Sequence, residues 1–527
     1  MDELALVITD ASGEELSFST TSDDPDKLVQ ITRIKTRRGV GFETCEFKIP
    51  RDAIRRYDDL DYLQKVGVYW PDGDCAFYGS ITARAIDSGA VQFTASGDFQ
   101  ITKDRSGISE VYIDVSMERW GGFSLDRQAA LLPTYAPTDA IIGGGGIKLQ
   151  LAGIPWTNPG LPATGALYTA PPGVDLGSIS ASLLRTATEW DTANANFALY
   201  LGFSSDAATA SDLSSDLAAN VGTAYAASQS SSTSGRRFAL MEASYGAAAA
   251  TSDSKERAVK ATSVKVKGTH GLDTITPSTV IKNIIDRWCP GITYDADSIQ
   301  DHPYELEHLV FEEVEPAEAI ARANGVANWW FEVWENGKAY YGPSPLLSEP
   351  DYLLDVEDGA TLSPDNKSVD ENYPVNGCEV FYTDALTGYR EMVGPDDSSL
   401  LTSADDENPC NKQDRNRYLK VNIEYPCSAN NAAQVGSVAF AEAIIPSRAG
   451  DGVVVGEVMT ADGQMVPAGK IRAGKVARYL HEEAGREVFE TDYEPMISKN
   501  SVKYDNNPAT LGAILARIGI RVAGVGK

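Results

Sequence analysis

One continuous stretch, residues 276–343, constrains most strongly what this chain can fold into. It begins with Thr276 before Pro277, a pair typical of a helix N-terminus, because threonine caps the first turn and proline fits the first helical position. Apolar residues then recur at helical spacing as far as Trp288, and the Cys-Pro-Gly of residues 289–291 ends the run. The pattern predicts a capped amphipathic helix.

A second helix and a hairpin are expected directly after it. Glu315-Pro316 starts the helix, and Asn324-Gly325 closes it. Residues 329–334, Trp-Trp-Phe-Glu-Val-Trp, then read as an aromatic strand. Asn336-Gly337 is a strong short-range hairpin signal, and residues 338–341 return as the partner strand. Alternation along the strand puts the tryptophans on both of its faces, which favours core packing.

This order of elements resembles the small α/β domain of phage tail-tip hub proteins, the relatives of the central hub of the T-even phage baseplate and of tail-associated proteins. Two shorter patterns are similar to the same family. Residues 77–81, Phe-Tyr-Gly-Ser-Ile, resemble a hairpin strand of the first hub barrel. Residues 376–382, Asn-Gly-Cys-Glu-Val-Phe-Tyr, resemble the strand that opens the second barrel, with Cys378 as a departure. The closest description is an actinophage-type minor tail protein with an inserted β-sandwich.

The expected fold is mainly β with a small α/β module. Alternating strands before residue 110 fit a small antiparallel barrel. From residue 147 the composition shifts to Ala, Ser, Thr and Gly, and several short strands suggest a jelly-roll-like sandwich. The four glycines at residues 143–146 mark a boundary, because no Gly-Lys-Ser/Thr follows to make a phosphate loop. The expected units are a first hub β-barrel (1–110), a connector (111–146), the inserted sandwich (147–269), the helix–helix–hairpin domain (270–345), a second hub β-barrel with a helix (346–460), and C-terminal strands that complete this barrel with a terminal helix (461–527).

Composition excludes several classes of partner. The 527 residues are enough for roughly three to five domains. The 45 Lys+Arg stand against 75 Asp+Glu, a formal net charge of -30, which argues against a surface that binds DNA or anionic membranes. Solubility explains this charge, and so does a repulsive lining for a channel that DNA crosses. The six cysteines are expected as buried reduced thiols, with a Cys410–Cys427 pair as the alternative.

The sequence offers little chemistry for catalysis. His302 and His308 lie six apart, and Gly485 stands where a zinc motif that starts at His481 needs its second histidine. No nucleophile elbow is present, and the acidic run that starts at Asp295 lacks the glycine and glutamate of a calcium loop. We expect no enzyme, no metal and no cofactor. Paired carboxylates in a cleft are the one catalytic arrangement that spacing cannot reveal.

Two sets of residues are candidates for a functional surface. Aromatic residues of the insert stack on sugar rings or, alternatively, anchor a sandwich core. Acidic residues just before the expected second barrel are candidates for a pore wall, since a cationic wall would retain passing phosphates. The glycan-contact candidates are Trp156, Tyr168 and Trp190; the pore-lining candidates are Asp351, Asp355, Glu357, Asp358, Asp365, Asp370 and Glu371.

The resemblance implies a structural role at the tail tip of a virion assembled in the host cytoplasm. It implies a homotrimer whose duplicated barrels join a six-fold tube to a three-fold tip. Implied partners are the distal tail protein, the tape-measure protein, and needle, receptor-binding or other minor tail proteins. No sequence-specific nucleic acid is implied, although DNA passes through the lumen. The alternatives are a tail protein that binds cell-surface glycans and a tail-associated cell-wall hydrolase.

Overall fold

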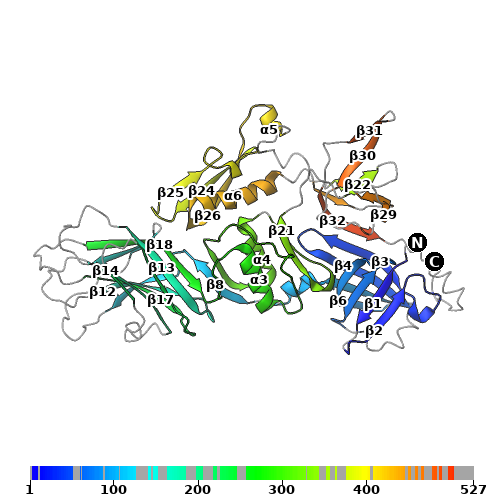
Figure 1. Ribbon diagram of the computed structural model, residues 1–527, viewed down its shortest axis with the longest axis horizontal. Coiled ribbons are helices and arrows are strands. Elements are labelled where there is room, and N and C mark those ends of the chain that lie inside the picture. Colours follow the sequence, from blue (N-terminus) through cyan, green and yellow to red (C-terminus); the bar gives the residue numbers. More distant parts are fainter. Residues whose placement is uncertain are drawn as a thin grey trace, which may run out of the picture.

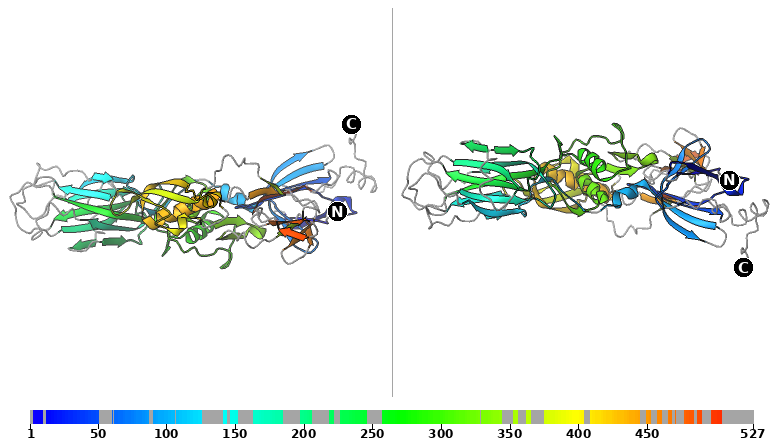
Figure 2. Two further views of the ribbon diagram at one scale, coloured as in Figure 1. Left: turned by 90° about the horizontal axis from the view of Figure 1, so that it is seen from above. Right: turned by 90° about the horizontal axis from the view of Figure 1, so that it is seen from below.

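The protein is described by a computed structural model in which the chain forms an elongated body. The β-sandwich lies at one end, the N-terminal β-domain lies at the other, and the helices α3 (Pro277–Trp288) and α4 (Pro316–Ala323) lie between them (Figure 1, Figure 2). The structure describes residues 3–9, 12–50, 60, 62–86, 90–105, 107–125, 141–143, 146–151, 163–184, 197–205, 218–221, 226–245, 257–327, 329–343, 352–355, 362–364, 375–403, 408–444, 449–452, 457–460, 465–467, 470, 477–483, 486–489 and 496–503.

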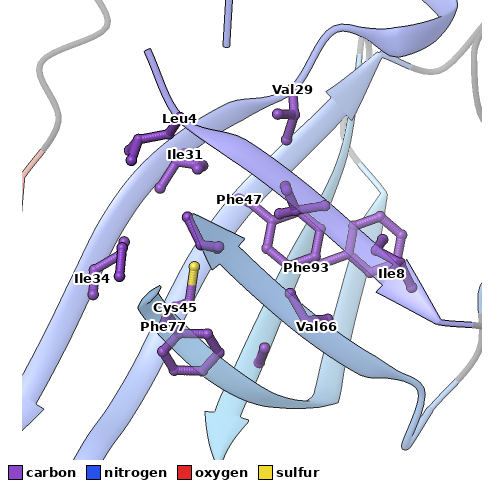
Figure 3. Close-up of a cluster of buried hydrophobic side chains, with 14 of the residues drawn as sticks. Leu4, Ile8, Val29, Ile31, Ile34, Cys45, Phe47, Val66, Phe77 and Phe93 are labelled. Carbon is purple, nitrogen blue, oxygen red and sulfur yellow. The ribbon is translucent and has the colours of Figure 1, made fainter. Parts of the chain in front are cut away.

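The N-terminal β-domain is built from alternating strands that bury one face. Ile31, Phe47 and Phe93 pack in its core, where the rings of Phe47 and Phe93 stack 5.2 Å apart (Figure 3). The strands pair in the order β2-β1-β5-β6-β7-β4-β3. Their bounds are β1 (Ala5–Thr9), β2 (Glu15–Ser19), β3 (Gln30–Arg37), β4 (Gly41–Pro50), β5 (Lys65–Tyr69), β6 (Cys75–Ile86) and β7 (Ala90–Gly97).

The sequence predicted a closed first barrel, and the described strands do not form one. The pairing path does not return from β3 to β2, and between them there is only an isolated bridge from Ser19 to Leu28, with the Val29 amide donating to the Ser19 carbonyl at 3.1 Å. Instead, β32 (Met496–Lys503) pairs antiparallel with the edge of β3. Strands β27 (Ala449–Gly452) and β23 (Leu362–Pro364) then extend the sheet further. A strand far along the chain therefore occupies the hydrogen-bonding edge that barrel closure would need.

The insert is a two-layered antiparallel β-sandwich, as expected. Ile179 and Val266 of one sheet share a core with Leu201 and Met241 of the other. The first sheet has the order β10-β11-β18-β13-β16, and the second has the order β15-β14-β17-β12-β9. The bounds are β9 (Trp120–Leu125), β10 (Ile141–Gly143), β11 (Gly146–Leu151), β12 (Ala163–Thr169), β13 (Leu176–Leu184), β14 (Phe197–Ser204), β15 (Ala218–Val221), β16 (Ala226–Ser230), β17 (Phe238–Tyr245) and β18 (Arg257–Gly268).

The boundary expected at residue 147 falls inside this sandwich. Strands β9 and β10 come from the segment 111–146 that we assigned to a connector, yet each pairs with a strand of the insert. The glycines at the β10–β11 turn join two paired strands and do not separate two domains. The jelly-roll connectivity stays a prediction, and so does the helix expected around residues 125–132, which lies outside the described residues beyond Leu125.

The helix–helix–hairpin module is confirmed. The Thr276 side chain accepts a hydrogen bond from the Thr279 amide and caps α3, while Pro316 opens α4. Strands β20 (Trp329–Val333) and β21 (Ala339–Pro343) form the hairpin, and Asn336 and Gly337 both adopt left-handed φ angles in its turn. The sequence did not indicate strand β19 (Leu309–Val314). It lies in the linker between α3 and α4 and pairs with β8 (Ile108–Asp114).

The region expected as a second barrel divides among separate sheets. Strands β24 (Gly377–Asp384), β25 (Arg390–Val393) and β26 (Tyr418–Cys427) form a three-stranded sheet. Helix α6 (Ala429–Ile444), which the sequence predicted, covers one face of it. A further sheet has the order β29-β28-β22-β30-β31. Its strands are β22 (Tyr352–Asp355), β28 (Glu457–Thr460), β29 (Met465–Pro467), β30 (Ala477–Glu483) and β31 (Arg486–Phe489).

The second-barrel expectation therefore does not hold for the described strands. Strand β24 pairs parallel with β26 and does not open an antiparallel barrel, because α6 fills the apolar face that a barrel would enclose. The stretch expected as a loop between residues 396 and 411 includes the short helix α5 (Pro409–Lys412). The terminal helix expected after residue 510 lies outside the described residues. Within the described part of the chain, no helix is both long and apolar enough to cross a membrane.

Candidate functional site: a buried polar junction on strand β8

Strand β8 is shared by two cores. Its Val111 packs in the sandwich core, while Tyr112 and Ile113 pack in the core of the helix–helix–hairpin module. The strand pairs with β18 on one side and with β19 on the other. Because Ile108, Val111, Tyr112 and Ile113 are buried on the two faces of the strand, the carboxylates of Glu110 and Asp114 are carried into the interior with them.

Glu110 joins β8 to the C-terminal end of α3. The residue is 4% exposed, and its Oε1 lies 2.8 Å from Arg287 Nη1 and accepts a hydrogen bond from Trp288 Nε1 at 3.2 Å. Burial raises the pKa of Glu110 above its usual range, and the Arg287 charge opposes that rise. Within the described residues, Oε2 has no hydrogen-bond partner; it lies 3.8 Å from His270 Nδ1.

His270 sits beside this carboxylate in a fixed orientation. Its Nε2 lies 2.9 Å from the Val111 carbonyl, so this nitrogen donates, and Nδ1 accepts from Arg287 at 3.0 Å. The Tyr112 ring stacks on the imidazole with centroids 4.0 Å apart, and the Tyr112 hydroxyl donates to Asn283 Oδ1 at 2.6 Å. Burial lowers the pKa of His270 to about 4, so the ring is neutral at neutral pH.

Asp114 joins β8 to the sandwich and to the linker. The residue is 1% exposed; its Oδ2 accepts from the Tyr168 hydroxyl at 2.7 Å, and its Oδ1 accepts from the Ser116 amide at 2.8 Å. His308 Nδ1 lies 3.3 Å from the same Oδ1, and the His308 ring stacks on Tyr425 of β26 with centroids 4.9 Å apart. One carboxylate therefore contacts the second sandwich sheet and, through His308, the three-stranded sheet.

The same linker also caps α6. Glu307 accepts hydrogen bonds from the Ser428 amide at 2.8 Å and from the Ser428 hydroxyl at 2.6 Å. Ser428 in turn caps the helix by accepting from the Asn431 amide at 3.1 Å. Together these contacts fasten three modules to one another around β8. Their chemistry is that of a structural junction, since each carboxylate is engaged with groups of the same chain.

Sequence reasoning missed this junction. Its only local signal was a pair of acids, Glu110 and Asp114, in a strand that is otherwise mostly apolar, and this pattern does not say which partners the acids meet. His270, Arg287 and His308 come from segments far along the chain. No spacing rule places them at β8.

The predicted glycan-contact residues do not gather into a described site. Tyr168 is fully buried, with its ring edge-on to Trp120 at 5.5 Å and its hydroxyl on Asp114, so it belongs to the core and is not available to a sugar. Trp156 and Trp190 lie outside the described residues, and their assignment stays a prediction. Among the pore-lining candidates only the backbone of Asp355, in β22, is described. The others fall outside: Asp351, Glu357, Asp358, Asp365, Asp370 and Glu371.

The residues examined for metal binding make other contacts. Asp295 lies 2.5 Å from Lys338 Nζ, and Asp301 lies 2.8 Å from Lys282 Nζ. His302 packs edge-on against Trp329 at 4.6 Å, far from the junction partners of His308. Across the described ranges no group of three or more His, Cys, Asp or Glu side chains is arranged to hold a metal ion. All six cysteines are buried and none is in a disulfide, so the alternative of a Cys410–Cys427 disulfide does not hold.

Comparisons with known proteins give a distant likeness only. No protein-family model matches the sequence, and no curated protein matches it. Among solved structures, a 43 kDa tail protein of prophage MuSo2 from Shewanella oneidensis is 9% identical, over 95% of this chain and 92% of that chain, with a TM-score of 0.38. A tail protein from Neisseria meningitidis MC58 is 10% identical over 92% and 89%, with a TM-score of 0.38.

A third structure is the prophage tail protein gp18 from Listeria monocytogenes EGD-e. It is 8% identical over 98% of this chain and 99% of that chain, again with a TM-score of 0.38. Scores at this level assign neither a family nor an activity to this chain, so its function is argued below from its own residues.

Proposed function

We propose that this chain is a structural protein of a bacteriophage tail, and that it acts as the hub of the tail tip. The observation that carries the proposal is the junction between the helix–helix–hairpin module and the N-terminal β-domain. The sequence resemblance to hub proteins rests on that module, and the structure contains it with both helices and the hairpin at the expected residues.

The two units are fastened through backbone and side chains. The Val333 amide donates to the Val40 carbonyl at 3.0 Å, and the Gly39 amide donates to Glu332 Oε1 at 3.1 Å. Trp334, the last aromatic residue of the hairpin run, is 8% exposed and belongs to the core of the N-terminal β-domain. A rigid coupling of this kind suits a protein that holds two assembled rings in a fixed relative orientation. Domains that moved independently would not fix that orientation.

In this proposal three copies form a ring that joins the six-fold tail tube to three-fold tip or receptor-binding components. Strand β32, which comes from the C-terminal part of the chain, pairs with the edge of β3 and so joins that part to the N-terminal β-domain within each copy. The net charge of -30 keeps a channel wall from retaining DNA. The proposed partners are the distal tail protein, the tape-measure protein, and needle or receptor-binding proteins.

Electron microscopy of the purified full chain tests the proposal. We expect particles with three-fold symmetry and an open centre, and a mass near three times 56.6 kDa by light scattering. A chain that stays monomeric at high concentration and in the presence of a distal tail protein would overturn the hub assignment. Cell-wall hydrolysis that is lost on changing one carboxylate would replace it with the enzyme alternative.

A further inference from the structure

A lysine-bearing face of the sandwich is chemically unlike the rest of this acidic chain. Six residues on β13, β16 and β18 point away from the sandwich core, and we refer to them as the serine–lysine face. They are Ser178, Ser180, Ser228, Ser230, Lys265 and Lys267.

Strand register puts these residues side by side. Ser178 pairs with Lys267, and Ser180 pairs with Lys265, between β13 and β18. Between them Ile179 pairs with Val266, and both of these side chains are fully buried in the core. Because side chains alternate along a strand, the lysines and serines must face the other way.

The adjoining strand continues the same surface. Ser178 pairs with Ser230, and Ser180 pairs with Ser228, on β16, where both serines are exposed. The result is a flat hydroxyl-bearing surface three strands wide.

The two lysines of the face lack counter-charges. Neither Lys265 nor Lys267 forms an ion pair with any described residue, although acids outnumber bases by 75 to 45 in the chain. Other lysines of the described part do find acids: Lys65 pairs with Asp98, and Lys338 pairs with Asp295. Unpaired neighbouring cations on an acidic protein fit an anionic partner.

A hairpin turn adds apolar and aromatic surface beside this strand. The Ser263 amide of β18 donates to the Ala385 carbonyl at 3.2 Å, which docks the turn between β24 and β25 against the sheet. In that turn Leu386 is 58% exposed and Tyr389 is 74% exposed. Exposed tyrosine beside hydroxyls is a common way for proteins to hold sugar or polyol units.

We propose that the serine–lysine face, with the neighbouring turn, binds an anionic polyol or carbohydrate polymer whose repeats carry phosphodiester groups. The lysines meet the phosphates and the serines exchange hydrogen bonds with hydroxyls. Duplex DNA is disfavoured, because the deoxyribose units within its strands carry no free hydroxyl group for the serines to bind, whereas the charge of -30 opposes either polymer. The sandwich lies at the far end of the body from the N-terminal β-domain (Figure 1).

The test is binding of the full chain to soluble poly(glycerol phosphate), measured by calorimetry or biolayer interferometry at several salt concentrations. The variant Lys265→Glu/Lys267→Glu should weaken binding by about tenfold or more, since each surface lysine contributes on the order of 1 kcal/mol. The matched control is Lys27→Glu/Lys103→Glu, which makes the same change of net charge at two exposed lysines of the N-terminal β-domain and its flanking turn. Its affinity should stay within about twofold of that of the unmodified chain.

Several results would overturn the inference. They are no binding at all, equal binding by both variants, and binding to poly-glutamate or to short duplex DNA in preference to the polyol phosphate. Lys265→Ala/Lys267→Ala checks that a loss of affinity does not come from misfolding, with its unfolding temperature as the readout. The inference goes beyond the proposed tail-tip role and does not rest on it, because the polymer should bind whether or not the chain assembles into a ring.

Discussion

The indole of Trp334 meets the ring of Phe42 edge-on, with the two ring centroids 4.9 Å apart. Trp334 directly follows the hairpin strand β20 of the α/β module, and Phe42 lies on β4 of the N-terminal β-domain. Residues almost 300 positions apart in the chain therefore share one core. Gly41, next to Phe42, makes this approach close, because a Cβ there would collide with the Val333 carbonyl oxygen.

The first prediction compares two glycines of the same turn. Gly41→Ala should lower the free energy of unfolding of the N-terminal β-domain by about 3 kcal/mol or more, because it adds a collision to an unfavourable positive φ. Gly39→Ala is the matched control: Gly39 also has a positive φ, but a Cβ there meets nothing, so only about 1 kcal/mol is expected. Urea titration monitored by hydrogen exchange in β3 and β4 measures both. Equal losses would show that the approach of Val333 is unimportant.

The second prediction concerns the cap of α6. Glu307→Ala should expose the Ser428 amide and hydroxyl and cost about 1 to 3 kcal/mol of local stability, as expected for hydrogen bonds to a charged group. Hydrogen exchange across residues 429–444 should accelerate, while exchange in β1 to β7 stays unchanged. Glu305→Ala is the control, because Glu305 is exposed and makes no such contact. Unaltered exchange in α6 would contradict the cap.

The third prediction is a pH dependence set by His270. Its pKa is about 4 in the folded protein and about 6.5 when unfolded. The folded state therefore holds fewer protons in this window, so its stability is full above pH 6.5 and falls as the pH drops toward 4. The loss attributable to His270 is about 3 kcal/mol.

His270→Gln should remove that slope, measured as the urea midpoint at pH values from 4 to 7. Two charged groups face the ring: Arg287, which disfavours protonation, and Glu110, whose raised pKa gives a slope of the opposite sign. The comparison is therefore made in a Glu110→Gln background. An unchanged slope after the histidine substitution would rule out this assignment.

The fourth prediction concerns the thiols. Burial raises the pKa of Cys289 and of Cys427 to about 12, and all six cysteines are buried thiols outside any disulfide. Native protein at pH 8 should thus react with a thiol reagent far more slowly than unfolded protein, which should show six thiols. Rapid labelling of the native chain, or fewer than six thiols after unfolding without reductant, would contradict the structure.

The sequence by itself determined the local elements whose ends or turns are marked by strong capping and turn residues. Thr276-Pro277 fixes the start of α3, and Asn336-Gly337 fixes the hairpin turn, because each depends only on backbone preferences of neighbouring residues. Several short strands separated by polar turns also indicated a sandwich in the insert, while its jelly-roll connectivity stays a prediction. These signals act over a few residues, so they survive without knowledge of the tertiary fold.

Only the tertiary structure decided how sheets are completed and which groups meet. Strand β32 takes the edge of β3, and β9 joins the sandwich, because hydrogen-bonding edges and apolar faces are satisfied by whichever strand reaches them. A strand pattern does not specify its partner. For this reason the sequence predicted closed barrels that the described strands do not form, and it placed β9 and β10 outside the insert whose strands they pair with. The junction on β8 has the same cause: the partners of Glu110 and Asp114 are set by the packing of three modules around one buried strand, and no spacing in the sequence encodes that packing.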